Sequence, residues 1–163
     1  NTLNLKNDFE EIANVVKISH SMFYLGRGLD FLIAVEGALK SKEISYIHSE
    51  AFASGELKHG TIALIEEGVP VIINLTQESL IEKSISNIKE VAARGAYIIA
   101  VATKGTPMID EAANEVFYIP KVKDENTGFL TIIIHQLMAY YLSALKGLDV
   151  DKPRNLAKSV TVE

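Results

Sequence analysis

The sequence contains no cysteine among its 163 residues. Disulfides, thiolate zinc sites and cysteine nucleophiles are therefore excluded from this chain, and the composition fits a reducing compartment, so we expect a cytoplasmic protein. Basic residues are sparse as well: the 16 lysines and arginines include no adjacent pair, and the formal net charge is -5. A mildly acidic domain of this kind is a poor candidate for binding the phosphate backbone of nucleic acids.

The sequence also lacks a recognisable secretion signal or membrane span. Its first ten residues carry three charged side chains and no apolar core. The most apolar stretch, residues 129–145, is interrupted by four polar residues and is shorter than the ~20 residues that a membrane span requires. We therefore expect neither a membrane nor a nucleic acid as a partner.

Short β-rich runs alternate with longer helical patterns along the chain. Apolar runs typical of strands covered on both faces lie at residues 22–25, 69–75, 97–102 and 116–119, with a weaker strand at 50–53. Helical patterns lie at residues 7–19, 28–47, 55–66, 77–94 and 127–146, and a polar tail covers residues 148–163. The alternation predicts a single α/β domain, a three-layer doubly wound parallel sheet that binds ligands at the carboxyl ends of its strands.

The last helical pattern is apolar almost all round. One face carries Leu130, Ile133, Ile134, Leu137, Tyr141, Ala144 and Leu145, and further apolar residues lie elsewhere on the helix. Such a helix is buried on more than one side. Two interpretations remain open, namely the central helix of the core and a subunit or domain interface.

The most informative pattern is the helix over residues 30–48. At about 100° per residue, one stripe about 60° wide contains Glu36, Lys40, Glu43 and Ile47. Apolar residues flank the stripe: Leu32, Val35, Leu39 and Tyr46 on one side, and Ile33, Gly37 and Ile44 on the other. The residues suited to water lie mostly opposite, namely Asp30, Ser41, Lys42, Ser45 and His48. The pattern predicts that the charged stripe lies in the middle of the face that packs on the sheet.

A solvated Glu–Lys pair is the usual explanation for opposite charges four residues apart on a helix. Here the charges bisect an apolar arc, and burying charges is costly unless they pair or line a cavity. An ammonium held between two carboxylates is an arrangement that tunes proton transfer. We therefore predict that Glu36, Lys40 and Glu43, hereafter the acid–base trio, line a functional site.

His59 is the next candidate, because a histidine followed directly by glycine is open to close approach by a ligand. Taken alone, the residue pattern favours a surface or helix-capping role for this histidine. The four histidines show no metal-ligand spacing, and a metal site is not supported. Lys158 is by default a solvated lysine of the tail, although a desolvated lysine forms a Schiff base with a carbonyl substrate.

Two loops are candidates for holding an anion. Residues 26–28 (GRG) follow the first strand and precede the long helix, so their backbone N–H groups are placed to face an anion at the helix N-terminus. A third glycine is missing, which favours a tight turn over dinucleotide binding. Thr76, Gln77 and Ser79 follow another strand, where they are suited either to a phosphate or to capping the next helix.

Three blocks of sequence together resemble the second sugar isomerase (SIS) subdomain of the glucosamine-6-phosphate synthase family. They are residues 36–48 (EGALKSKEISYIH), residues 55–60 (GELKHG) and residues 151–163 (DKPRNLAKSVTVE). The resemblance covers nearly the whole chain and implies a flavodoxin-like SIS fold. It also implies that residues 148–163 are a catalytic tail and that Glu163 is the C-terminus.

The resemblance implies a role for each candidate. Glu43 matches the carboxylate that moves a proton between C1 and C2 of the open-chain sugar, with Glu36 and Lys40 beside it. His59 matches the histidine that opens the fructose 6-phosphate ring and reaches the site from the partner subunit of a homodimer. Lys158 matches the lysine that forms an imine at C2, and Ala157, Lys158 and Glu43 are implied to bind substrate. The product is glucosamine 6-phosphate, and no cofactor is implied.

The family enzyme has two further parts that this sequence lacks. They are a glutaminase domain with a cysteine nucleophile and a first SIS subdomain whose Ser/Thr loops hold the sugar phosphate. We therefore expect a C-terminal fragment that is inactive alone and has those two parts as partners in a longer chain. Two alternatives remain open: a non-catalytic sugar-phosphate-binding or dimerisation module, and an isomerase of another phosphosugar.

Overall fold

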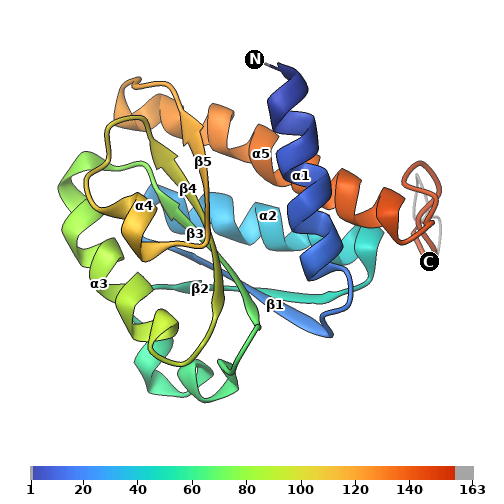
Figure 1. The fold of residues 1–163 in the computed structure, drawn as a ribbon, viewed down its shortest axis with the longest axis horizontal. Helices are drawn as coiled ribbons and strands as arrows, with labels where there is room; N and C mark the ends of the chain where they lie inside the picture. Colours follow the sequence, from blue (N-terminus) through green and yellow to red (C-terminus); the bar gives the residue numbers. More distant parts are fainter. Residues whose placement is uncertain (1, 157–163) are drawn as a thin grey trace, which may run out of the picture.

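Five parallel strands form one sheet in the computed structural model, which describes residues 2–156. They are β1 (Ser21–Gly26), β2 (His48–Ala53), β3 (Pro70–Leu75), β4 (Tyr97–Thr103) and β5 (Glu115–Ile119), in the order β2-β1-β3-β4-β5 (Figure 1). This is the flavodoxin-like order of a doubly wound sheet, with its switch point between β1 and β3. The predicted fold class is confirmed.

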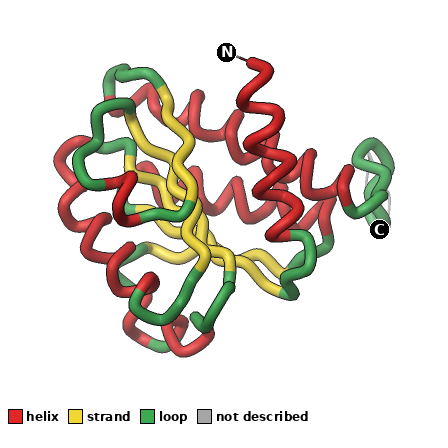
Figure 2. Tube along the Cα trace, viewed as in Figure 1, coloured by secondary structure: helices red, strands yellow, loops and turns green. Residues whose placement is uncertain are grey.

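Helices cover both faces of the sheet (Figures 1 and 2). One face carries α1 (Thr2–Val16), α2 (Leu29–Ser45) and α5 (Asp124–Leu145). The other carries η1 (Leu57–His59), η2 (Thr61–Leu64), η3 (Glu78–Leu80), α3 (Ile81–Ala92) and α4 (Ile109–Ala112). Neighbouring strand residues contribute to different cores, as Ile72 and Ile73 do, because successive side chains point to opposite faces of a strand.

Two helical expectations need correction. The single helix expected over residues 55–66 is a pair of short 3-10 helices, because Gly60, with φ 143°, interrupts the helical backbone between η1 and η2. The helix expected from residue 77 begins as η3 and continues as α3 from Ile81, so Thr76 is not its cap. The four-residue helix α4 is too short to show a period and was not predicted.

The buried side of α2 differs from the expected one. Its buried residues are all small or short: Asp30, Ala34, Gly37, Ala38, Ser41 and Ser45. At Gly37 a β-carbon would lie only 2.8 Å from Cγ of His135 on α5 and 3.0 Å from Cε1 of Tyr24 on β1. Small residues let α2 approach its neighbours closely, and the larger residues Leu32, Val35 and Leu39 are exposed instead of packed on the sheet.

Helix α5 is buried on one side only. Its buried side includes Ile134, Met138 and Leu142, whereas Phe129, Ile133, Leu137 and Tyr140 are exposed. The helix extends back to Asp124, so it is longer than the apolar stretch in the sequence, and by length and composition alone it could cross a membrane. Helices that line the core of a globular domain pass the same test, and α5 packs on α1 and α2 in this way. The core interpretation is confirmed for the buried side, and an interface on the exposed side stays a prediction.

A chain of buried polar groups joins α2, α5 and the sheet. Nε2 of His135 lies 3.0 Å from Oδ1 of Asn74, whose Nδ2 donates to the backbone oxygen of Asp30 at 3.0 Å. Because the Asn74 oxygen is the acceptor, the imidazole carries its proton on Nε2. The Tyr24 and Ser41 hydroxyls are hydrogen-bonded at 2.6 Å. Ser41, expected on the outer face, is thus a buried partner.

The buried imidazole makes the stability of the fold depend on pH. Burial lowers the pKa of His135 to about 4 from 6.5. Between these values the unfolded chain binds a proton that the folded chain excludes, so stability is complete above the unfolded pKa and falls as the pH drops below it. We expect the free energy of unfolding in urea to fall by about 2 kcal/mol from about pH 7 to about pH 5 because of this group.

The contribution of His135 is isolated by comparing two variants. His135→Gln should remove this part of the pH dependence, whereas His48→Gln, which changes an exposed histidine on β2, should retain it. An equal pH dependence in the wild type and in His135→Gln would contradict the assignment.

Candidate functional site

The acid–base trio forms one connected group on α2. Nζ of Lys40 lies 2.8 Å from Oε2 of Glu43 and 3.6 Å from Oε1 of Glu36. The hydrogen bond to Glu43 is the main influence that raises the pKa of Lys40, and the two negative charges act in the same direction. Lys40 is therefore an ammonium that donates a charge-assisted hydrogen bond to the Glu43 carboxylate.

The trio lies on the outer side of α2, contrary to the expected packing on the sheet. The side chains of Glu36, Lys40 and Glu43 are 44%, 32% and 29% exposed. On one side the trio is flanked by the exposed residues Leu32, Val35 and Leu39. On its other side lies α5, which packs against α2. One predicted apolar flank, Leu32, Val35 and Leu39, faces outward. The other lies toward α5: Gly37 is buried, and Ile33 and Ile44 are half-buried.

His59 lies on the opposite side of the sheet from the trio. It ends η1, whose Leu57 belongs to the core on the α3 side, whereas α2 contributes Ala34 to the core on the other side. The imidazole is 73% exposed, and its Nδ1 lies 2.8 Å from Oε2 of Glu56. The structure does not bring His59 and the trio of one chain together. Ala157 and Lys158 lie outside the described residues.

The crevice at the switch point between β1 and β3 is filled by the protein itself. The carboxyl group of Asp30, in the first turn of α2, accepts the backbone N–H of Thr76 at 2.9 Å and lies 2.5 Å from the Thr76 hydroxyl. That hydroxyl lies 2.8 Å from Oγ1 of Thr127 on α5. Burial raises the pKa of Asp30, and the Thr76 hydrogen bonds act against it. Asp30 was expected on the water-facing side, and it is 3% exposed.

The side chain of Gln77 also lies in this crevice, against the N-terminus of α2. With its amide oxygen toward α2, it accepts the backbone N–H groups of Leu29 and Asp30 at 2.9 and 3.2 Å. These are the N-terminal donors of α2 that a phosphate would otherwise bind. The loop was predicted either to bind a phosphate or to cap the helix that follows it. The structure favours capping, but Thr76 and Gln77 contact the N-terminus of α2 and not the helix that follows them.

Similarity to known proteins identifies the family of the chain. The family model for the SIS domain matches residues 17–146. The chain belongs to the SIS domain family. Glutamine–fructose-6-phosphate aminotransferase (isomerizing) of Clostridium tetani is 58% identical over 154 residues, which cover 94% of this chain and 25% of that protein. The corresponding enzyme of Methanosarcina mazei is 50% identical over 161 residues, covering 99% and 26%. The predicted resemblance is confirmed.

A solved structure supports the same assignment. The C-terminal domain of glucosamine-fructose-6-phosphate aminotransferase from Francisella tularensis has a TM-score of 0.83 and 38% identity, covering 92% of this chain and 42% of that chain. This SIS domain spans about a quarter of the length of the curated relatives that it matches. In the solved structure, more than half of the chain lies outside the match.

Two cavities lie among the described residues of this SIS domain, and the trio and His59 line neither. The larger, about 290 Å³, opens at the carboxyl ends of β3 and β4, where hydroxyls of Thr76, Thr103 and Thr106 face a mixture of lysines and carboxylates. No group of three or more histidine, aspartate and glutamate side chains in residues 2–156 is placed to hold a metal ion. Neither of these two cavities is the one expected around the trio.

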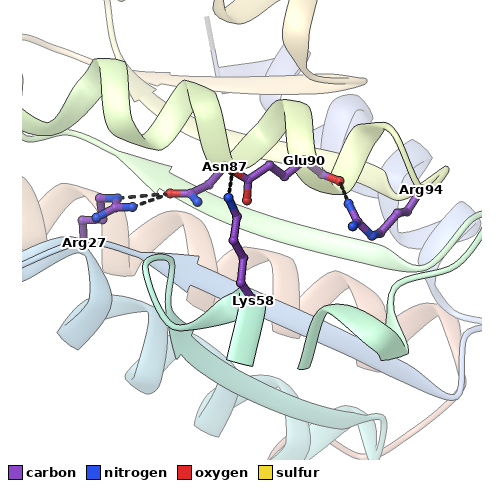
Figure 3. A network of polar contacts seen from close by, with 5 residues as sticks. All are labelled: Arg27, Lys58, Asn87, Glu90 and Arg94. Atoms are coloured by element: carbon purple, nitrogen blue, oxygen red, sulfur yellow. Dashed lines mark hydrogen bonds and ion pairs between the residues drawn. The ribbon is translucent and has the colours of Figure 1, made fainter. Parts of the chain in front are cut away.

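The smaller cavity, about 190 Å³, lies beside η1 and α3 (Figure 3). There Arg27 donates from Nε and Nη2 to Oδ1 of Asn87 at 3.1 and 2.8 Å. Lys58 pairs with Glu90 at 2.9 Å, and Arg94 donates to the backbone oxygen of Glu90. Arg27 thus ties the loop after β1 to α3, an arrangement with no signal in the sequence, because the two residues are 60 positions apart.

The filled crevice yields a stability test. Asp30→Ala leaves the buried N–H of Thr76 without its acceptor, so we expect a loss of about 2–3 kcal/mol in the free energy of unfolding, measured in urea. Asp8→Ala, which changes an exposed aspartate on α1, should alter it by no more than about 0.5 kcal/mol. Equal stability of the two variants would contradict the proposed role of Asp30.

Proposed function

We propose that this SIS domain is the C-terminal half of the isomerase part of a glucosamine-6-phosphate synthase. The longer protein would convert fructose 6-phosphate and glutamine-derived ammonia to glucosamine 6-phosphate. The observation that carries the proposal is 58% identity to an enzyme so named, over 94% of this chain. The absence of cysteine and the water-soluble substrate support a cytoplasmic location.

The trio supplies the chemistry in this proposal. A ketose becomes an aldose when one base takes a proton from one carbon and returns it to the neighbouring carbon. Glu43 is the base, in the role that the family resemblance implies. Its carboxylate is hydrogen-bonded to the Lys40 ammonium at 2.8 Å, and Glu36 adds a second carboxylate on the other side of Lys40. His59 of a partner subunit opens the sugar ring, and the Lys158 amine condenses with the C2 carbonyl with release of water. Ammonia then displaces the Lys158 amine and leaves its nitrogen on C2, after which Glu43 moves a proton from C1 to C2 and the O1 proton passes to that nitrogen. The exposure of His59 supports a role in another subunit's site.

The exposed side chains around the trio support a covering partner. Leu32, Val35 and Leu39 on α2 and Phe129, Ile133, Leu137 and Tyr140 on α5 form what we call the apolar face. Exposed apolar patches of this extent mark interaction surfaces. Covering the face would remove water from the trio and strengthen its ion pairs.

We propose that the first SIS domain of the longer chain covers the apolar face. The match leaves more than half of the solved C-terminal domain from Francisella tularensis unaccounted for, which is room for another domain of this size. That domain would also supply the grip on the sugar phosphate, because Asp30 and Gln77 fill the corresponding crevice here. The homodimer of the proposal would use other surfaces, including the one that presents His59.

The role of Glu43 is tested in the longer protein. Glu43→Gln removes the base and keeps the shape, so we expect the rate of glucosamine 6-phosphate formation to fall about 100- to 10,000-fold with little change in KM. Glu50→Gln, at an exposed carboxylate on the edge strand β2, is the matched control and should retain activity. Unchanged turnover in Glu43→Gln would remove Glu43 from the mechanism.

Borohydride reduction separates this proposal from a non-catalytic SIS module. With fructose 6-phosphate present, the longer protein should be covalently labelled on Lys158, which peptide mass spectrometry detects. A protein that binds the sugar without labelling Lys158 would favour the module.

The covering of the apolar face is tested by comparing two contexts. Ile133→Glu places a charge on this face, so it should change the free energy of unfolding of the isolated chain by no more than about 0.5 kcal/mol. In the longer protein the same charge would be buried without a partner, and we expect a loss of about 3 kcal/mol or more. Ile18→Glu, at an exposed apolar residue outside the face, should be neutral in both.

Two outcomes would contradict the assignment of the first SIS domain. A small effect of Ile133→Glu in both contexts would mean that nothing covers the face. Loss of self-association of the isolated chain, measured by sedimentation, with no effect on the longer protein, would assign the face to a second copy.

A further inference from the structure

Tyr46 adopts a backbone conformation that is unfavourable for a bulky residue. It ends α2 with φ 60° and ψ 18°, in the left-handed region. The other described non-glycine residues with positive φ are Met108 and Asn155. Helices commonly end in this conformation, but glycine or asparagine usually occupies the position because a side chain is crowded there. A tyrosine kept at such a position points to a role for its side chain.

The side chain of Tyr46 makes two contacts with one residue of the tail. The backbone N–H of Arg154 donates to the Tyr46 hydroxyl at 2.8 Å. The guanidinium carbon of the same arginine lies 4.0 Å from the centre of the Tyr46 ring, which is the geometry of a cation–π contact. From Asp149 to Leu156 the tail is otherwise exposed or half-buried. Tyr46 therefore provides a specific attachment for the tail.

Neighbouring contacts fix the same corner of the molecule. Near the end of α5, the Ser143 hydroxyl donates to the backbone oxygen of Ile44 at 2.7 Å, and Nζ of Lys146 donates to that of Ser45 at 2.7 Å. Oδ1 of Asp149 then accepts the backbone N–H groups of the two residues at 151 and 152, which forms a tight turn. The chain thus leaves α5 beside the end of α2 and turns to meet Tyr46.

We propose that Tyr46 is a positioning residue that anchors the C-terminal tail to the end of the helix that carries the acid–base trio. Glu43 precedes Tyr46 by three residues, about 4.5 Å along the helix axis. Lys158 follows Arg154 by four residues, which span at most about 14 Å. The anchor therefore limits how far the Lys158 backbone can lie from the end of α2. The anchor itself stands on Tyr46 and Arg154, and only its benefit to catalysis rests on the proposed function.

Trypsin provides a direct test of the anchor in the purified chain. Trypsin cleaves after Arg154 only when the guanidinium has left the Tyr46 ring and entered the protease. In Tyr46→Gly, which suits the left-handed conformation and removes the ring, we expect cleavage between Arg154 and Asn155 to be about tenfold faster than in the wild type. Tyr46→Phe keeps the ring and loses the hydroxyl, so its rate should be intermediate.

Met108→Gly is the matched control. It also replaces a non-glycine residue in the left-handed conformation, but Met108 is far from the tail in sequence, so the cleavage rate should be unchanged. Circular dichroism melting curves show whether each variant is folded. Cleavage of folded Tyr46→Gly at the wild-type rate would overturn the anchor. Equal acceleration in Tyr46→Gly and Met108→Gly would also overturn it, because a general loosening would then explain the result.

A second measurement tests the benefit to catalysis in the longer protein. Borohydride labelling of Lys158 with fructose 6-phosphate should be about tenfold slower in Tyr46→Gly, while the affinity for the sugar is retained. Equal labelling rates would overturn the catalytic benefit of the anchor. If the wild type is not labelled at all, the proposed function fails, whereas the protease result still decides whether the anchor exists.

Discussion

The close approach of α2 to α5 and the sheet is the constraint on which the rest of the structure depends. At Gly37 the backbone of α2 lies against the His135 ring, and no β-carbon fits between them without displacing the ring. Small residues on the buried side leave Leu32, Val35 and Leu39 of α2 exposed, while Phe31, Ile33 and Ile44 are half-buried. The same packing places the trio on the outer side of α2, next to the exposed apolar side chains of the apolar face.

Sequence periodicity predicted the sheet well and the orientation of α2 poorly. The strands are apolar runs covered on both faces, so their number, order of appearance and parallel arrangement follow from the alternation with helices. For α2, hydrophobicity was a misleading guide, because the buried side was selected for small size. Ser41 and Ser45 read as polar, yet both are fully buried and hydrogen-bonded.

The contacts within the trio were predictable from the sequence, and their environment was not. The spacing of Glu36, Lys40 and Glu43 was sufficient to identify a connected trio, since three- and four-residue separations place side chains together on any helix. Residues that act across long sequence separations were not identifiable in the same way. Asp30 meets Thr76 across 46 positions, and Tyr46 meets Arg154 across 108. Such pairs are brought together by the assembled fold, and no local sequence pattern predicts them.

The self-filled crevice at the switch point has a consequence for stoichiometry. Two domains of one fold, placed side by side in a single enzyme, offer two equivalent places for the same small molecule. A domain whose crevice already holds its own carboxyl and amide groups leaves only one of those places vacant. In the proposed pairing with a first SIS domain, the two domains would therefore accept a single sugar, and this domain would contribute reactive groups instead of competing for the substrate.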